Sequence, residues 1–273
     1  MDQQQLIDSI RSKSSFLCVG LDPDPDRIPA HLGSGPEAVL RFNLAIIEAT
    51  SDLAVAYKPN VAFYEALGES GWGVLKATMD AIPEGCLRIA DAKRGDIGNT
   101  ATRYAKAVFE AWNAHAVTVA PYMGRDSVEP FLAFEDKWTI LLAATSNPGA
   151  EDFEFHGAEC GQPLWQRVLE VSRSYEGAER LMYVVGATRP ELLAECRSTV
   201  PDRFLLVPGV GAQGGTMEAV CEAGWAPGLA GGLLVNVGRS LLYASDGPDF
   251  AAAARREAAA IQQVMAGVLA ANR

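Results

Sequence analysis

The chain has 273 residues, of which 49% are hydrophobic and 21% are charged, as is typical of a globular protein with a sizeable core. Its formal net charge of −11 argues against non-specific binding to nucleic acid or to an anionic membrane, because both attract cationic surfaces. Any phosphate group must therefore be held by a local site. The amino-terminal residues lack the apolar stretch of a signal peptide and no segment reaches transmembrane length, so we expect a cytoplasmic protein.

The five cysteines are scattered, odd in number and without a C-x-x-C pair, which indicates a reducing compartment and not a disulfide framework. Cys18 and Cys86 lie in strand-like runs, so we interpret them as core residues and not as nucleophiles. His31, His115 and His156 are isolated and lack the spacing of paired metal ligands. We therefore expect no metal site.

Short apolar runs rich in β-branched residues alternate with segments of helical periodicity along the chain. This alternation predicts an α/β fold, a (β/α)8 TIM barrel that forms a single domain over residues 1–273. A doubly wound sheet is the alternative, because strand–helix units alone do not require closure. In chain order the predicted strands are Phe16–Asp22, Leu53–Asn60, Cys86–Lys93, Ala116–Pro121, Trp138–Ser146, Leu181–Thr188, Phe204–Gly211 and Gly232–Arg239. The clearest predicted helices are Glu37–Thr50, Thr100–Asn113, Pro163–Tyr175, Gly214–Ala223 and Pro248–Ala271.

Polar and glycine-rich clusters fall at the carboxyl ends of these strands, where barrel enzymes build their active sites. The sharpest cluster is Asp91-Ala-Lys93-Arg-Gly-Asp96 after strand three. Residues two apart in a strand share a face, so Asp91 and Lys93 are expected to point into the barrel. A lysine between two carboxylates stays protonated and suits a proton donor. The alternative is a surface salt-bridge cluster in front of a helix.

Charged residues also close the first two strands. Lys58 ends strand two and Asp22 ends strand one, and a charge that ends a buried strand needs a partner or a ligand. Lys58 is expected to join the carboxylates after strand three in a network of alternating charge. Asp24 and Asp26, which follow Asp22 in an Asp-Pro-Asp-Pro-Asp turn, are interpreted as helix-capping residues.

Gly209–Gly214 matches the G-x-G-x-x-G pattern of dinucleotide-binding proteins, which by itself is weak evidence. That fingerprint belongs to an early strand–helix unit with an acidic residue about twenty positions further on. Here the pattern follows strand seven, and the next strand ends in Gly238-Arg239. Glycines after strand seven and an arginine after strand eight instead predict a barrel phosphate site, with two glycine turns and a surface arginine as the alternative.

The quoted segments together resemble the orotidine 5′-phosphate decarboxylase family, in particular its longer bacterial subgroup, over nearly the whole chain. The matching segments are Phe16-Leu-Cys-Val-Gly-Leu-Asp22, Tyr57-Lys-Pro-Asn60 with Phe63 and Glu65, Asp91-Ala-Lys-Arg-Gly-Asp-Ile-Gly98, Thr145-Ser-Asn-Pro-Gly-Ala150, Pro208-Gly-Val-Gly-Ala-Gln-Gly-Gly215 and Asn236-Val-Gly-Arg239.

The resemblance implies a carbon–carbon lyase of pyrimidine biosynthesis that converts orotidine 5′-monophosphate (OMP) to UMP without a metal or an organic cofactor. By this resemblance Asp91 faces the substrate carboxylate, Lys93 donates the proton to C6, and Lys58 holds the network together. Asp96 and Ile97 would enter the active site of the neighbouring subunit, which implies a homodimer.

The resemblance also implies a set of substrate-binding residues. Asp22 and Lys58 would bind ribose hydroxyls, and Ser146 would contact the pyrimidine. Gln213 would bridge base and phosphate. The phosphate end of the site would be formed by Pro208, Gln213, Gly238 and Arg239.

Two other interpretations remain open at this stage. Hexulose-phosphate synthases and keto-gulonate-phosphate decarboxylases share the D-x-K-x-x-D strand but use a magnesium ion, with an acidic residue near the end of strand two. Here that strand ends in Lys58, a poor metal ligand while protonated. The other is a catalytically silent sensor of phosphoribosyl ligands on the same fold.

Overall fold

The computed structural model describes residues 1–157, 161–210 and 214–272. Its eight strands form a closed barrel in chain order. The strand pairs β1–β2, β2–β3, β5–β6 and β6–β7 have a defined parallel register. The strands are β1 Leu17–Leu21, β2 Ala56–Pro59, β3 Leu87–Arg94, β4 Ala116–Val119, β5 Trp138–Ala144, β6 Leu181–Val185, β7 Leu205–Pro208 and β8 Leu233–Val237. The predicted (β/α)8 fold is confirmed, and the doubly wound alternative is wrong.

Most strand residues are buried, and every residue of β1, β2, β4 and β6 is. This continuous burial is expected of parallel strands covered by helices, and it explains why eight short apolar runs were recognisable. The predicted ends extended too far in several places. Arg239, expected to end strand eight, is the first residue of a helix, because the chain turns at Gly238 directly after Val237.

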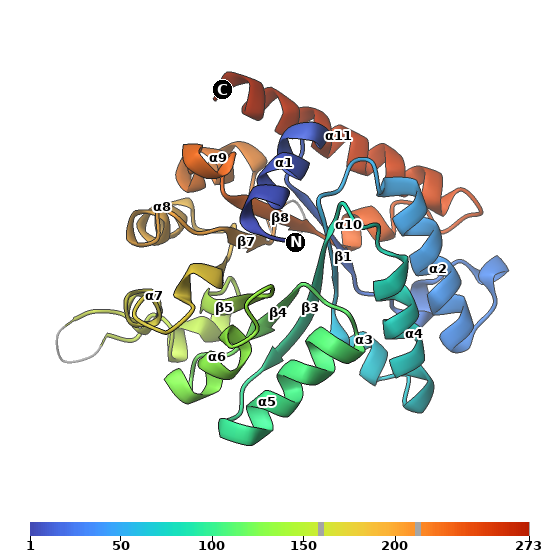
Figure 1. The fold of residues 1–273 in the computed structure, drawn as a ribbon. Coiled ribbons are helices and arrows are strands. Elements are labelled where there is room, and N and C mark those ends of the chain that lie inside the picture. Colours follow the sequence, from blue (N-terminus) through green and yellow to red (C-terminus); the bar gives the residue numbers. More distant parts are fainter. Residues whose placement is uncertain (158–160, 211–213, 273) are drawn as a thin grey trace. The chain divides into compact units, whose positions relative to one another are not determined.

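The chain divides into two compact units, of which the first comprises Met1–Ala92, Ala107–Ala116 and Asn236–Arg273. Its long carboxy-terminal helix α11 packs against α2, and the Gln262 amide in α11 donates to the carbonyls of Lys13 and Ser14 at the end of α1 (Figure 1). The helices of this unit are α1 Gln3–Lys13, α2 Gly35–Thr50, α3 Val61–Glu65, α4 Glu69–Ala81, α10 Arg239–Leu242 and α11 Phe250–Ala271. The last of these confirms the helix expected over Pro248–Ala271.

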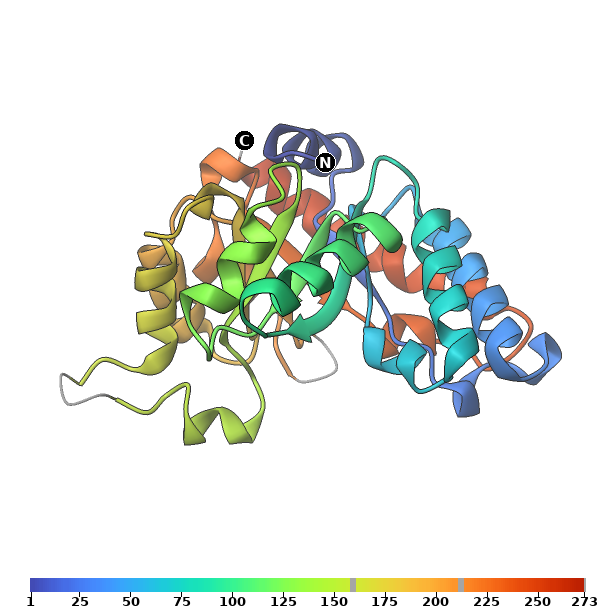
Figure 2. The same cartoon turned by 60° about the horizontal axis from the view of Figure 1, so that its bottom comes forward.

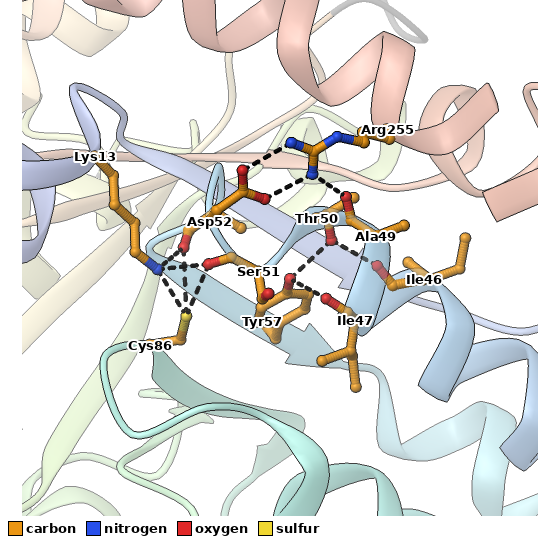
Figure 3. A network of polar contacts seen from close by, with 11 residues as sticks. Lys13, Ile46, Ile47, Ala49, Thr50, Ser51, Asp52, Tyr57, Cys86 and Arg255 are labelled. Carbon is orange, nitrogen blue, oxygen red and sulfur yellow. Dashed lines mark hydrogen bonds and ion pairs between the residues drawn. The ribbon is translucent and has the colours of Figure 1, made fainter. Parts of the chain in front are cut away.

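A polar network fastens the amino-terminal side of β2 in this unit (Figure 3). The Lys13 ammonium donates to the carbonyls of Ser51 and Ala54, both at 2.7 Å, and to the Cys86 sulfur at 3.2 Å. Arg255 of α11 binds both carboxylate oxygens of Asp52 at 2.7 and 2.8 Å. This hydrogen-bonded pair lowers the pKa of Asp52 below its usual value. The network precedes the strands, which leaves their carboxyl ends to other side chains.

The second unit comprises Lys93–Lys106 and Val117–Val235, with helices α5 Gly98–Lys106, α6 Arg125–Leu132, α7 Leu164–Ser172, α8 Pro190–Thr199 and α9 Met217–Gly224. The helix expected over Thr100–Asn113 is α-helical only to Lys106 and continues as a π-helical turn over Ala107–Ala111. Among the described residues, no helix combines the length and the apolar character that crossing a bilayer requires.

Arg197 of α8 is a buried cation that binds backbone carbonyls in this unit. Its guanidinium donates to Gly224, Val200, Arg203 and Gly232 at 2.7, 3.1, 2.6 and 2.9 Å. Burial lowers its pKa to about 10. The arginine thereby joins the ends of α8 and α9 to the residue that precedes β8.

We expect Arg197→Met to destabilise the protein by about 3–5 kcal/mol, because methionine leaves several buried carbonyls without a charged donor. The measurement is the free energy of unfolding in urea. Arg173→Met is the matched control, because that exposed arginine binds one backbone carbonyl, that of Thr199, within the described part of the chain. Equal losses in the two variants would contradict this role for Arg197.

Candidate active site

A buried ion pair joins the carboxyl-terminal halves of β2 and β3. The Lys58 ammonium lies 2.7 Å from an Asp91 carboxylate oxygen, and the two side chains are only 6% and 10% exposed. Both residues belong to the first unit. The sequence predicted that the two side chains would meet, and the structure brings them together, although β3 continues past Asp91 to Arg94.

The local sequence explains why β2 ends directly after Lys58 and Pro59. Pro59 ends β2 and cannot donate a further backbone bond to the ladder. Asn60 then caps α3, its side-chain oxygen accepting from the Ala62 N–H at 3.3 Å, and forms an isolated parallel bridge with Asp91. After β2 the chain turns into α3, and the side chain of Lys58 lies against Asp91 of β3.

Two neighbouring carboxylates keep Lys58 charged. Burial alone would lower the pKa of this ammonium, but the negative charges of Asp91 and Asp22 outweigh burial and raise the pKa well above its usual range. Asp22, directly after β1, is therefore close enough to act on Lys58. Burial raises the pKa of the nearby Cys18 thiol to about 12, so that this cysteine is a neutral core residue, as the sequence predicted.

The ends of β1 and β8 approach each other closely in the same unit. A Cβ on Gly20 would lie 3.2 Å from the Asn236 side chain and 3.3 Å from Gly238, so this approach favours glycine. Asn236 also accepts a long contact of 3.7 Å from the Cys18 thiol. Sequence reasoning gave Asn236 no role, although a lone amide in the apolar strand Leu233–Val237 was a usable signal.

Arg239 follows Gly238 as the first residue of α10 and is exposed. Within the part of the chain that the structure describes, its guanidinium makes no ion pair. An exposed arginine at the end of a barrel strand can bind an anion through two parallel hydrogen bonds. The assignment of Arg239 to a phosphate stays a prediction.

The remaining predicted residues of the D-x-K-x-x-D segment belong to the second unit. Lys93 is exposed and has a left-handed backbone, with φ of 45°, which is held by a 2.9 Å bond from its N–H to the Thr118 hydroxyl. The regular alternation assumed from the sequence therefore does not extend to this residue. Asp96 accepts from the Ile97 N–H at 2.8 Å, and Ile97 is 52% exposed.

Ser146 follows β5 in the second unit and is fixed through its neighbours. The Glu154 carboxylate accepts from the Thr145 N–H at 2.6 Å and from its hydroxyl at 2.8 Å. Ser146 also packs so close to Gly186 that a Cβ there would lie 2.9 Å from the serine Cβ. Figure 2 shows residues 145–157, which follow β5, projecting from the strands of this unit. Glu154 lies in that segment, where the sequence had no diagnostic pattern.

Pro208 ends β7 and is followed by Gly209, whose φ of 101° demands glycine. Val210 forms an isolated bridge with Gly215. The turn after strand seven therefore begins as the glycine pattern predicted. Gln213, predicted to bridge base and phosphate, lies outside the described residues.

A closed parallel barrel with a buried lysine–carboxylate pair and further charged side chains after its strands defines a (β/α)8-barrel enzyme. Residues 15–255 match the model of the orotidine 5′-phosphate decarboxylase / HUMPS family. The chain is 55% identical to orotidine 5′-phosphate decarboxylase of Flavobacterium johnsoniae, over 98% of both chains. It is 53% identical to the enzyme of that name from Christiangramia forsetii, over 98% of this chain and 99% of the relative.

Solved structures agree with the sequence comparisons. The structure of Leishmania donovani OMP decarboxylase is similar, with a TM-score of 0.82 and 37% identity over 96% of this chain and 100% of that one. The chain therefore belongs to the orotidine 5′-phosphate decarboxylase / HUMPS family, as the sequence resemblance indicated, and it is an enzyme of the decarboxylase class.

The buried pair predicts a specific pattern of stability. We expect Lys58→Met to cost about 3–5 kcal/mol, because it leaves the buried Asp91 carboxylate without its cation, whereas Lys58→Met/Asp91→Leu should recover most of this loss. The free energy of unfolding in urea measures both. A single variant as stable as the wild type would contradict the pairing.

Proposed function

We propose that this decarboxylase converts OMP to UMP and carbon dioxide, using charged side chains and no metal or organic cofactor. The observation that carries the proposal is the buried Lys58–Asp91 pair in the carboxyl-terminal halves of β2 and β3, in a chain about half identical to enzymes of this name. A carboxylate kept ionised by an adjacent ammonium is a fixed charge, and fixed charges are effective where charge changes during a reaction.

In the proposed reaction, Asp91 lies beside the carboxylate of the substrate. The C6–carboxylate bond breaks, carbon dioxide leaves, and its bonding electron pair remains on C6 as a carbanion. The ammonium of Lys93 stabilises that charge and transfers a proton to C6, which gives UMP. Lys58 keeps Asp91 charged and oriented throughout. The left-handed backbone of Lys93 supports a special role for this residue, because such strain concentrates at functional sites.

The remaining predicted residues bind the substrate in this proposal. Asp22 and Lys58 bind ribose hydroxyls, and Ser146 contacts the pyrimidine. The exposed guanidinium of Arg239 supports an assignment to the phosphate. The phosphate end of the site would be completed by Pro208, Gln213 and Gly238.

We expect the purified, EDTA-treated protein to lower the ultraviolet absorbance of OMP as UMP forms. Lys93→Ala should reduce turnover by about 10³-fold or more, because it removes both the electrostatic stabilisation and the proton donor. Lys106→Ala, which changes an exposed lysine at the end of α5, is the control.

Three other outcomes would change the proposed function or its mechanism. Turnover that requires added magnesium would overturn the metal-free mechanism and favour the chemistry of the magnesium-dependent relatives. UMP binding without turnover would favour a sensor. A fully active Lys93→Ala variant would remove the proposed proton donor.

We also propose that the enzyme is a homodimer in which Asp96 and Ile97 enter the site of the neighbouring subunit. Exposed large apolar side chains follow β3 and β4 in the second unit, where Ile97, Tyr122 and Met123 are 52%, 84% and 49% exposed. Exposed apolar groups of this size commonly mark protein interfaces.

The four described cysteines are buried free thiols, which supports a reducing compartment, and we propose the cytoplasm.

Shared sites predict complementation between two inactive variants. In a mixed dimer of Lys93→Ala and Asp96→Ala subunits, one site would regain both an intact lysine and an intact partner aspartate. Random exchange of equal amounts should therefore restore about a quarter of wild-type activity, because half of the dimers are mixed and each has one intact site. If activity does not return after subunit exchange has been verified, Asp96 acts within its own subunit.

A further inference from the structure

The hydroxyl of Tyr243 binds two backbone groups of the turn after β1. The Asp24 N–H donates to the tyrosine oxygen at 2.6 Å, and the hydroxyl donates to the Asp22 carbonyl at 3.1 Å. A phenol can accept and donate at the same time, so both bonds form together. Burial raises the pKa of Tyr243, which keeps the proton that the second bond needs.

The turn depends on this side chain because of its sequence. Pro23 and Pro25 have no N–H, so the segment Asp22–Asp26 has few backbone donors with which to hold itself. The carboxylate of Asp24 is already used, because it accepts from the Asp26 N–H at 3.1 Å and caps a short 3-10 helix. This confirms the capping role expected of Asp24, and it leaves the tyrosine to fix the Asp22 end.

Tyr243 is itself fixed to the helix that begins with Arg239. Its N–H donates to the Arg239 carbonyl at 3.2 Å at the end of α10. The ring lies under the Arg27 guanidinium, 3.8 Å from the ring centroid, and stacks against Phe42. One residue therefore connects the turn that carries Asp22 to the helix that carries Arg239, all within the first unit.

We propose that Tyr243 is a positioning residue that holds the Asp22 turn in register with Arg239, so that the ribose and phosphate contacts of one substrate are correctly spaced. The inference rests on the proposed function, because it takes Asp22 as a ribose ligand and Arg239 as a phosphate ligand. Loss of the hydroxyl frees the backbone at Asp22 without removing any group that touches the substrate.

The test is Tyr243→Phe, which removes the hydroxyl and keeps the ring. We expect UMP to bind about 10-fold more weakly and KM for OMP to rise by a similar factor, with kcat changed less, because the hydroxyl supports a contact made equally in the ground state and the transition state. Calorimetry with UMP and the absorbance assay give the two readouts. Tyr183→Phe is the control, because that buried tyrosine binds Ser172 in the second unit.

A double-variant cycle separates positioning from a general structural effect. In an Asp22→Ala background, Tyr243→Phe should change UMP affinity less than about twofold, because its effect passes through Asp22. An equal loss in both backgrounds, or no loss in the wild-type background, would overturn the inference. A wild-type protein that neither binds UMP nor converts OMP would instead overturn the proposed function, and the inference with it.

Discussion

The ion pair between Lys58 and Asp91 sets the main physical constraint on this protein. Two opposite charges are buried side by side, and removing them from water is costly unless each remains in contact with the other. The ends of β2 and β3 must therefore keep a fixed register, which the Asn60–Asp91 bridge and the Pro59 strand end provide. A barrel is well suited to this task, because its parallel strands carry their last residues to the same end.

Other groups of the first unit act on that pair or hold the neighbouring strand ends together. Asp22 adds a second negative charge near Lys58, and the close approach of Gly20 to Gly238 brings the ends of β1 and β8 together. Tyr243 then links the Asp22 turn to α10. The stabilising contacts of Lys13, Asp52 and Arg255 lie on the amino-terminal side of β2 (Figure 3), whereas the Lys58–Asp91 pair lies further along β2 and β3.

In the second unit, the candidate residues are fixed by backbone geometry and local hydrogen bonds more than by burial. A left-handed lysine costs about 1–3 kcal/mol and persists only where its surroundings hold it, here through the bond from Lys93 to Thr118. Glu154 has a similar effect on the residue before Ser146, since it binds both the N–H and the hydroxyl of Thr145. These hydrogen bonds fix the backbone of Lys93 and of the residue before Ser146, and the proposed reaction uses Lys93 and Ser146.

The sequence by itself determined the fold class and the residue types at the strand ends. Continuous apolar strands and charged residues that close them, such as Lys58 and Asp91, are local patterns that follow from burial on two faces of a parallel sheet. The sequence also predicted that Lys58 and Asp91 would meet, but only the tertiary structure decided the contacts of residues that belong to no such pattern. The bonds of Tyr243 to the Asp22 turn join residues about 220 positions apart. The backbone of Lys93 departs from strand geometry. Both features depend on three-dimensional packing, which the spacing of residues in the sequence does not record.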